Sequence, residues 1–378
     1  MSNSTFRSSW AKAVAKATGV SLPGPLVGPE PGPGPGPERQ PSQTSGSQDS
    51  LREDTNLVEL SENLNNLLGQ DAWKLTPATY LNHVTAGTWQ AANHLLYVSS
   101  IVASAVAQGN GRIIVSMPPR HGKSELLSVG TPQWFLENYS DRHIILTSHT
   151  AELSSNFSRR VRDELREREA LVTVRIRKDV SKIAHFMTTK GGSLFSAGVG
   201  GPITGRGAHL LLVDDFIKTS EEAESVTIRQ KINDWFKSVA LTRLEPGGTC
   251  IILATRWHKH DLIGDLLGGQ EPDPEQSFKG YESVDRLTGE DSYEFAGEKW
   301  TYIELPAFPY EGSSDPLGRE ENEPLWPWRF DYAYLKRREA SIGRYFWKAL
   351  YQQRPIARSE WTFSQDNVGY VDIAPANS

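Results

Sequence analysis

The residues best suited to carry chemistry lie in residues 112–125, which read RIIVSMPPRHGKSE. A short apolar run leads into a turn, and Gly122, Lys123 and Ser124 then open a predicted helix. Such a turn offers backbone N–H groups and a positive helix N-terminus to a nucleotide phosphate, while Lys adds charge and Ser a metal ligand. The usual GxxxxGK[ST] pattern has Gly where this chain has Met117, so a chance GKS in an exposed turn is the alternative.

Two adjacent acids, Asp214 and Asp215, follow the apolar residues 210–213. A buried strand that delivers two carboxylates at its C-terminal end is typical of magnesium–nucleotide chemistry. We expect Asp214 to hold the metal and Asp215 to orient or deprotonate the attacking water. A lone Asp after a strand is often only a helix N-cap, but the pair and the GKS turn together favour the functional interpretation.

A third apolar run, at residues 249–255, ends in the sequence ATRWH. A polar side chain at the tip of a core strand beside the phosphate loop can sense the terminal phosphate. Thr255 and Arg256 are therefore candidates for coupling hydrolysis to movement.

The elements that position these residues alternate between apolar runs and helical patterns. The predicted strands are residues 112–117, 143–148, 210–213 and 249–255. The predicted helices are residues 55–68, 89–107, 124–136, 151–167, 221–244 and 331–351. Continuous apolar strands alternating with helices predict an α/β fold with a parallel sheet covered on both faces.

Composition excludes several classes of protein. The 378 residues are 38% hydrophobic and 23% charged, which is incompatible with a wholly disordered or fibrous chain. One cysteine, Cys250, excludes an internal disulfide framework and a cysteine-rich zinc site, and it fits a reducing compartment. A net charge of −6 excludes a surface that is basic throughout. Residues 95–107 are too short and too polar to span a bilayer, so we expect no membrane association.

The chain divides into four predicted regions. Residues 1–55 form a disordered tail, because residues 23–37 read PGPLVGPEPGPGPGP, a composition typical of a linker. Within this tail, residues 7–18 form a possible short basic helix that docks a partner or resembles a transit peptide. Residues 56–265 form the nucleotide-binding core, residues 266–360 a lid or linker subdomain, and residues 361–378 a C-terminal remnant.

Five segments in a fixed order extend this interpretation. The first four are MPPRHGKSE, SHTAELSSNFSRRVR, GGPITGRGAHLLLVDDFIK and RLEPGGTCIILATRWHKHDLIG, and the fifth contains both LWPWRF and ALYQQRP. Over residues 89–355 the chain resembles the ATPase (motor) domain of the terminase large subunit of tailed bacteriophages. The resemblance implies an additional-strand, RecA-like P-loop NTPase fold with a small lid or linker subdomain at its C-terminal end.

The resemblance also implies a viral genome-packaging motor subunit, an ATPase that translocates double-stranded DNA into a procapsid with ATP and Mg²⁺. Its partners would be DNA, the portal protein, the small terminase subunit and further copies of itself in a ring. It would act in the host cell cytoplasm and, transiently, at the portal vertex.

The family's site residues map onto the motifs of this chain. The residues implied to bind nucleotide are Pro119, Arg120, His121, Gly122, Lys123, Ser124, Glu125, Gln90 and Thr255. In the family, Lys123 acts on the triphosphate, Ser124 and Asp214 hold the metal, and the loop Arg120 contacts phosphate. Many members have Glu where this chain has Asp215; the shorter side chain needs a closer water or an altered backbone to act as the base.

Gln90 is the implied adenine contact. Together with Trp89 and His94 it precedes the predicted strand at residues 112–117, which leads into the phosphate loop. An aromatic residue and a His on a buried helix are also typical core residues, so a structural role is the alternative for this group.

Arg206, in the GRG of residues 205–207, is the implied arginine finger, presented to a neighbouring subunit. The alternatives are an ordinary loop Arg or a finger from Arg159, Arg160 or Arg162, which are otherwise expected to pair with acids of their own helix. Residues 158–190 are net basic and form either a DNA-contacting surface or plain surface.

Only 23 residues follow Pro355, too few for the nuclease domain of complete large terminases, so we expect this chain not to cut DNA. Two other functions stay open at this point. One is a two-lobed nucleic-acid helicase or translocase, and the other is an assembly protein that binds ATP without turnover, which Met117 and Asp215 favour.

Overall fold

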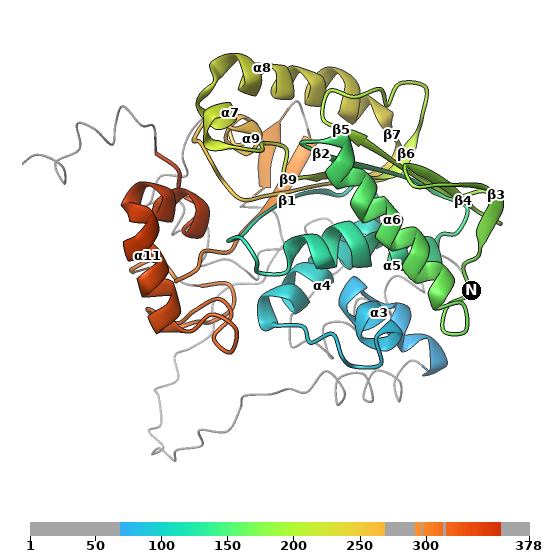
Figure 1. Cartoon of the computed structure of the whole chain (residues 1–378), viewed down its shortest axis with the longest axis horizontal. Coiled ribbons are helices and arrows are strands. Elements are labelled where there is room, and N and C mark those ends of the chain that lie inside the picture. The colour runs from blue at the N-terminus through green and yellow to red at the C-terminus, as the bar shows by residue number, and fades with distance from the viewer. Residues whose placement is uncertain (1–68, 269–291, 296–297, 313–314, 357–378) are drawn as a thin grey trace, which may run out of the picture.

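A nine-stranded sheet forms the centre of the molecule. The computed structural model describes residues 69–268, 292–295, 298–312 and 315–356 (Figure 1). The strands lie in the order β3-β4-β5-β2-β6-β7-β1-β9-β8. Their bounds are β1 Arg112–Ser116, β2 His143–Ser148, β3 Ile176–Lys182, β4 His185–Thr188, β5 Ser193–Gly198, β6 Ala208–Asp214, β7 Leu244–Ala254, β8 Ser292–Phe295 and β9 Glu298–Glu304. The four strands predicted from apolar runs are confirmed as β1, β2, β6 and β7.

The strands from β5 to β9 in this order are parallel, so their carboxyl ends share one edge. We call this edge the carboxyl edge, and the opposite one the amino edge. β7 pairs with both β1 and β6 and so separates the strand of the phosphate loop from the strand of the two acids. This inserted strand is the feature that defines the additional-strand P-loop fold, and it confirms the predicted fold class.

Helices cover both faces of the sheet, in three layers (Figure 1). On one face the helices α3, α4, α5 and α6 pack against alternate strand residues such as Val115, Leu146 and Leu212. On the other face α7, α8 and α9 pack against the intervening residues, such as Ile114 and Leu211. The alternation follows from the period of two along a strand, and it explains why the central strands are apolar throughout.

The helical elements have the following bounds. They are η1 Gly69–Lys74, α3 Pro77–Val84, α4 Asn93–Gln108, the π-helix η2 Glu125–Gly130, α5 Thr131–Asn138, α6 Ala151–Glu167, α7 Ser220–Glu224, α8 Val226–Trp235, η3 Phe236–Ala240, η4 Leu241–Arg243, α9 Leu262–Leu266, α11 Tyr332–Phe346 and η6 Trp347–Tyr351. No helix among these described residues has the length and apolarity needed to cross a membrane.

The C-terminal segment contributes to two parts of the molecule. β9 pairs with β1 in the central sheet, so the predicted division between residues 265 and 266 does not mark the end of the sheet. After β9, Phe308, Leu335 and Trp347 build a small separate core under α11, which stands beside the sheet in Figure 1. These residues lie within residues 266–360, for which a lid or linker subdomain is predicted. The predicted tail and the predicted helix at residues 55–68 lie outside the described residues.

Several predicted helices differ from the structure for identifiable reasons. The helix predicted over residues 221–244 is interrupted at Ser225, which has extended backbone and caps α8, and its last residue already belongs to β7. The helix predicted over residues 331–351 changes direction at Gly343, whose φ of 77° is left-handed. α4 begins at Asn93, four residues later than predicted, because residues 89–92 are not helical.

The strands β3, β4 and β5 were not predicted; β3 and β4 lie within the net basic segment at residues 158–190, and β5 follows it. β3 has one buried residue, Ile176, and its remaining side chains are half-buried or exposed. An edge strand with so few apolar residues has no alternating pattern from which it can be recognised.

Candidate functional site

The phosphate loop leaves β1 and enters η2 at the carboxyl edge of the sheet. Two of its residues have left-handed backbone, Arg120 with a φ of 66° and Gly122 with a φ of 86°. A Cβ atom on Gly122 would lie 2.9 Å from Leu95 Cδ1. Glycine is therefore required here both by its backbone conformation and by its close approach to α4.

Two buried histidines, His94 and His121, hydrogen-bond to backbone carbonyls of the phosphate loop. Nδ1 of His121 lies 2.9 Å from the carbonyl of Pro119, and Nε2 of His94 lies 2.8 Å from the carbonyl of His121. Carbonyl oxygens only accept, so each of these nitrogens donates. Burial lowers the pKa of His94 to about 3 and that of His121 to about 4, so both rings are neutral near pH 7. The alternative of a core role for His94 is the one that the structure supports.

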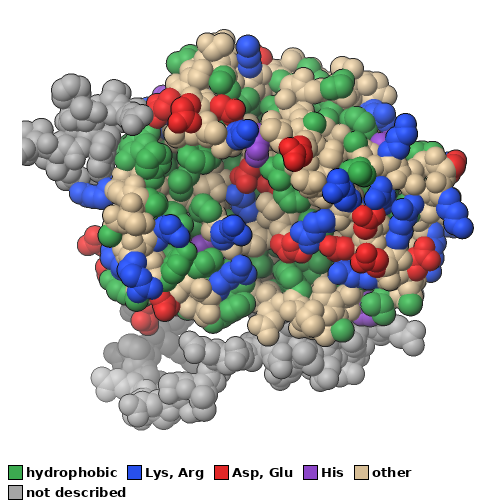
Figure 2. Space-filling model, viewed as in Figure 1, with side chains coloured by type: hydrophobic (Ala, Val, Ile, Leu, Met, Phe, Trp, Pro, Cys, Tyr) green, Lys and Arg blue, Asp and Glu red, His purple; other side chains and the backbone are tan. Residues whose placement is uncertain are grey.

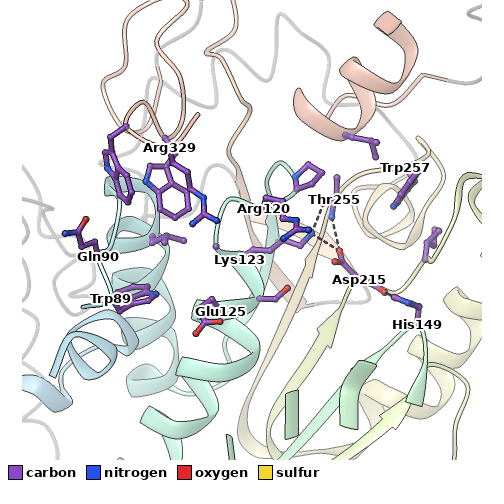
Figure 3. A pocket seen from close by; sticks show the side chains of 18 of the residues that line it. Trp89, Gln90, Arg120, Lys123, Glu125, His149, Asp215, Thr255, Trp257 and Arg329 are labelled. Carbon is purple, nitrogen blue, oxygen red and sulfur yellow. Dashed lines mark hydrogen bonds and ion pairs between the residues drawn. The ribbon is translucent and has the colours of Figure 1, made fainter. Parts of the chain in front are cut away.

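Lys123 connects the three strand ends that carry the motifs. Its Nζ donates to Thr255 Oγ1 at 2.7 Å and lies 2.9 Å from Asp215 Oδ1 (Figure 3). The Lys123 side chain is 8% exposed and that of Asp215 is 33% exposed, so the pair joins a buried cation to a carboxylate that water can reach. Three residues that the sequence placed in separate motifs thus meet at one point.

Asp215 has an unusual backbone for a residue other than glycine, with a φ of 43°. Its N–H donates to the carbonyl of Leu253 at 2.9 Å, and its Oδ1 accepts from the N–H of Thr255 at 3.3 Å. Asp tolerates the left-handed region better than most residues do. The sequence predicted that an acid shorter than Glu would need either a closer water or an altered backbone. The left-handed backbone of Asp215 is such an alteration.

Asp214 lies behind Asp215 and is completely buried. Its Oδ2 accepts from Ser128 at 2.6 Å, while its Oδ1 has no hydrogen-bond partner in the described part of the chain. Burial and the neighbouring Asp215 raise the pKa of Asp214, and the Ser124 side chain lies near enough to lower it. A buried carboxylate oxygen without a partner, next to a serine hydroxyl, fits the oxygen ligands that Mg²⁺ prefers.

These residues surround a cavity of about 850 Å³. Most predicted site residues line it, namely Gln90, Pro119, Arg120, Gly122, Lys123, Ser124, Glu125, Asp215 and Thr255. The side chain of His121 does not; its ring lies in the core, 4.7 Å from the ring of Phe330. This residue therefore offers only its backbone to a ligand. Asp214 and Arg206 are not among the lining residues either.

The cavity also has a wall that the sequence reasoning did not assign. Trp326, Trp328 and Arg329 line it, and Figure 3 shows Arg329 on the same side as Gln90. The guanidinium of Arg329 lies 4.8 Å from the ring centre of Trp326. The available signal was the segment LWPWRF, in which two Trp and an Arg fall within six residues. His149 and Trp257 complete the opposite side, and each follows the end of a predicted strand.

Arg206 and the cavity lie at opposite ends of β6. It precedes β6 at the amino edge, whereas Asp214 ends β6 at the carboxyl edge. Its side chain is exposed and lies over the ring of Phe195, 4.0 Å from the ring centre. The structure thus does not bring Arg206 to the cavity of the same chain.

The competing arginines of α6 are mostly paired. Arg160 makes two hydrogen bonds of 2.8 Å to Glu125 and also contacts Glu164, and Arg162 pairs with Asp163. Basic and acidic side chains alternate over α6 and β3 in Figure 2, without a continuous basic surface on this face. Glu125, predicted to bind nucleotide, is therefore already engaged by α6.

Comparison with known proteins assigns the family. The family model described as "Terminase large subunit, T4likevirus-type, N-terminal" matches residues 114–309, just over half of the chain. The comparison with curated proteins finds no match.

Similar solved structures include the large terminase of bacteriophage HK97, at 12% identity over 72% of this chain and 54% of that chain, with a TM-score of 0.41. The large terminase ATPase domain of Thermus phage P74-26 matches at 11% identity, over 75% of this chain and 100% of that chain, with a TM-score of 0.42. The Phi-28 gp11 DNA packaging motor matches at 14% identity, over 66% of each chain, with a TM-score of 0.33.

This chain spans about half the length of the HK97 protein. The assignment rests on the family model, which begins within β1 and covers the phosphate loop, the two acids and β9. The chain belongs to the family of T4likevirus-type terminase large subunits, of which the matched region is the N-terminal part.

Proposed function

We propose that this chain is an ATP-hydrolysing motor subunit that translocates double-stranded DNA into a procapsid. The proposal rests on one observation: Lys123, Asp215 and Thr255 contact one another beside the phosphate loop. Family membership supports the choice of DNA packaging over a helicase, since the family model is that of a packaging protein.

The residues divide the chemistry among them. Lys123, Arg120 and the loop N–H groups bind the triphosphate, and Gln90 contacts the base. Ser124 and Asp214 hold Mg²⁺, which supplies positive charge to the phosphate oxygens when bound. Asp215 orients the water and accepts its proton. In the present arrangement Lys123 neutralises Asp215, so a triphosphate that attracts Lys123 also frees the carboxylate to act as a base.

Arg206 acts in the cavity of a neighbouring copy, where it neutralises charge during phosphoryl transfer. Its position at the amino edge, away from its own cavity, supports a contribution between subunits. The proposal thus includes a ring of copies, docked on the portal protein with the small terminase subunit, in the host cytoplasm and at the portal vertex. Thr255, bonded to Lys123, links phosphate to the tip of β7.

The test is ATP turnover per subunit across a series of protein concentrations, with and without linear double-stranded DNA. Lys123→Ala is expected to abolish ATP binding and turnover, and Asp215→Asn to keep binding while losing turnover. Lys231→Ala, which removes an exposed lysine of α8 outside the net basic segment, is the matched control and should behave as the wild type.

Turnover that rises with protein concentration supports a ring with an intersubunit arginine. ATP binding without turnover at any concentration contradicts a self-sufficient ATPase and favours the assembly protein that binds ATP only. Retained turnover in Asp215→Asn contradicts its assignment as the base.

A further inference from the structure

His149, at the end of the neighbouring strand, contacts Asp215. It is the first residue after β2, which pairs with β6 so that Ser148 faces Asp214. This register places His149 beside Asp215, and both residues line the cavity (Figure 3).

Two donors of His149 converge on one oxygen. The carbonyl of Asp215 accepts the backbone N–H of His149 at 3.1 Å, and it lies 2.9 Å from the ring Nδ1. Because a carbonyl only accepts, Nδ1 carries a proton and donates it to this bond. The peptide that follows Asp215 is thus held on one side by His149, while the N–H of Asp215 is held on the other side by Leu253.

The segment that carries His149 is itself tightly held. The carbonyl of Ser148 accepts the N–H of Val199 at 2.8 Å, and the next residue, Thr150, caps α6 by accepting the N–H of Leu153 at 3.3 Å. A Cβ atom on Gly198 would lie 2.9 Å from the backbone N of Ala151. The turn from β2 to α6 therefore has little room to shift, and it gives the ring a fixed base.

We infer that His149 is a positioning residue for the proposed ATPase site. Its ring Nδ1–H and its backbone N–H hold the Asp215 carbonyl, and with it the left-handed backbone that directs the Asp215 carboxylate toward Lys123 and the cavity. This inference rests on the proposed function, in which Asp215 is the base. Removal of the ring donor leaves the phosphate contacts intact, so it lowers kcat and leaves KM for ATP nearly unchanged.

The experiment measures kcat and KM for ATP in His149→Ala and His149→Asn. We expect kcat to fall by about tenfold or more in His149→Ala, with KM changed by less than about twofold. An Asn side chain places an N–H donor close to the position of Nδ1, so His149→Asn is expected to recover most of the lost kcat.

The matched control is His143→Ala. His143 begins the same strand at the amino edge, and its ring bonds Ser193 Oγ at 3.0 Å. Its replacement removes a comparable side-chain hydrogen bond without contact with Asp215, so kcat should stay at the wild-type value. Thermal unfolding of every variant shows which ones are folded, and His149→Phe, which keeps a ring without a donor, replaces His149→Ala if the latter does not fold.

Asp215→Asn, measured alongside, separates the two hypotheses. Wild-type kcat in His149→Ala or His149→Phe, together with lost turnover in Asp215→Asn, overturns the inference and leaves the proposed function standing. Failure of His149→Asn to recover kcat likewise overturns the donor role. Retained turnover in Asp215→Asn contradicts the proposed function itself.

Discussion

The two edges of the parallel sheet hold their polar residues in different ways. At the carboxyl edge, Lys123, Asp215 and Thr255 are bonded to one another, and Lys123 and Thr255 are buried. At the amino edge, Arg206 is exposed and rests on the ring of Phe195. Under the proposed function, one chain assembles its phosphate site at the carboxyl edge, whereas the cation at its amino edge acts in a neighbouring copy.

The sharpest test of this difference is Arg206→Ala. We expect turnover to fall by about 10³-fold, because a charge that stabilises phosphoryl transfer is lost. In mixed assemblies with Lys123→Ala, some cavities combine an intact phosphate loop with an intact arginine of the neighbour, so turnover should partly return.

Arg142→Ala is the control for Arg206→Ala, because Arg142 makes a similar ring contact, 5.3 Å from the ring centre of Tyr139. A folded Arg206→Ala protein that mixed assembly does not restore would assign this arginine to its own chain and remove the distinction between the edges.

The next largest effect concerns the histidines behind the phosphate loop. Their folded-state pKa values, about 3 for His94 and about 4 for His121, lie below the unfolded value of about 6.5. As pH falls below 6.5, the unfolded chain takes up protons that the folded chain does not, so stability present at neutral pH is lost. Each histidine removes about 1.4 kcal/mol of unfolding free energy per pH unit until its folded pKa is reached.

Urea unfolding between pH 7 and pH 4.5 measures this loss. His121→Gln should flatten the dependence of unfolding free energy on pH, whereas His260→Gln, at an exposed position, should change it little. Equal slopes for the wild type and His121→Gln would contradict the neutral, buried state of the His121 ring.

Gly122→Ala tests how closely the loop packs at the carboxyl edge. We expect the free energy of unfolding to fall by about 1–3 kcal/mol, since a left-handed backbone and a contact with Leu95 both oppose a methyl group. Gly191→Ala is the control, because its φ is also positive, at 98°, but nothing lies within 4 Å of the new Cβ. The difference between the two variants in the free energy of unfolding, measured in urea, gives the packing contribution. Equal losses in both variants would show that the loop shifts to accommodate the methyl group.

The smallest effect is expected for Arg160→Ala. The ion pair between Arg160 and Glu125 is exposed, with both side chains more than a third accessible, so its loss should cost between 0 and about 1 kcal/mol. ATP turnover at saturating ATP should be nearly unchanged. A loss of turnover as large as that in Arg206→Ala would transfer the role of the finger to α6 and contradict the comparison of the edges.

The central strands and the phosphate loop were predictable because their signals are local. Four consecutive apolar residues before Asp214 and a GKS turn after β1 identify a strand end and a loop without reference to the rest of the chain. The direct bond between Lys123 and Thr255 was not predictable in the same way. It depends on β7 lying between β1 and β6, which is a property of the strand order.

His149 and Trp328 could not be assigned from sequence for a related reason. The contact of His149 with Asp215 depends on the register of β2 against β6, and Trp328 reaches the cavity from a segment that follows β9. The direction of the His121 ring could not be predicted either, because the ring packs away from the cavity while the backbone runs through the loop. A motif fixes the course of the backbone, while the direction of each ring depends on neighbours such as Phe330 that are distant in sequence.

The position of β1 between β7 and β9 has a consequence for synthesis on the ribosome. β9 (Glu298–Glu304) pairs with the side of β1 that β7 leaves open. It leaves the ribosome after all the other parallel strands, including β1, β6 and β7. Until then the nascent chain presents a bare strand edge of Ile113, Ile114 and Val115, an edge prone to pairing with other chains. Polypeptides released before Glu298 should therefore aggregate or require chaperones. The strand that leads into the phosphate loop is paired on both sides only once β9 has been added.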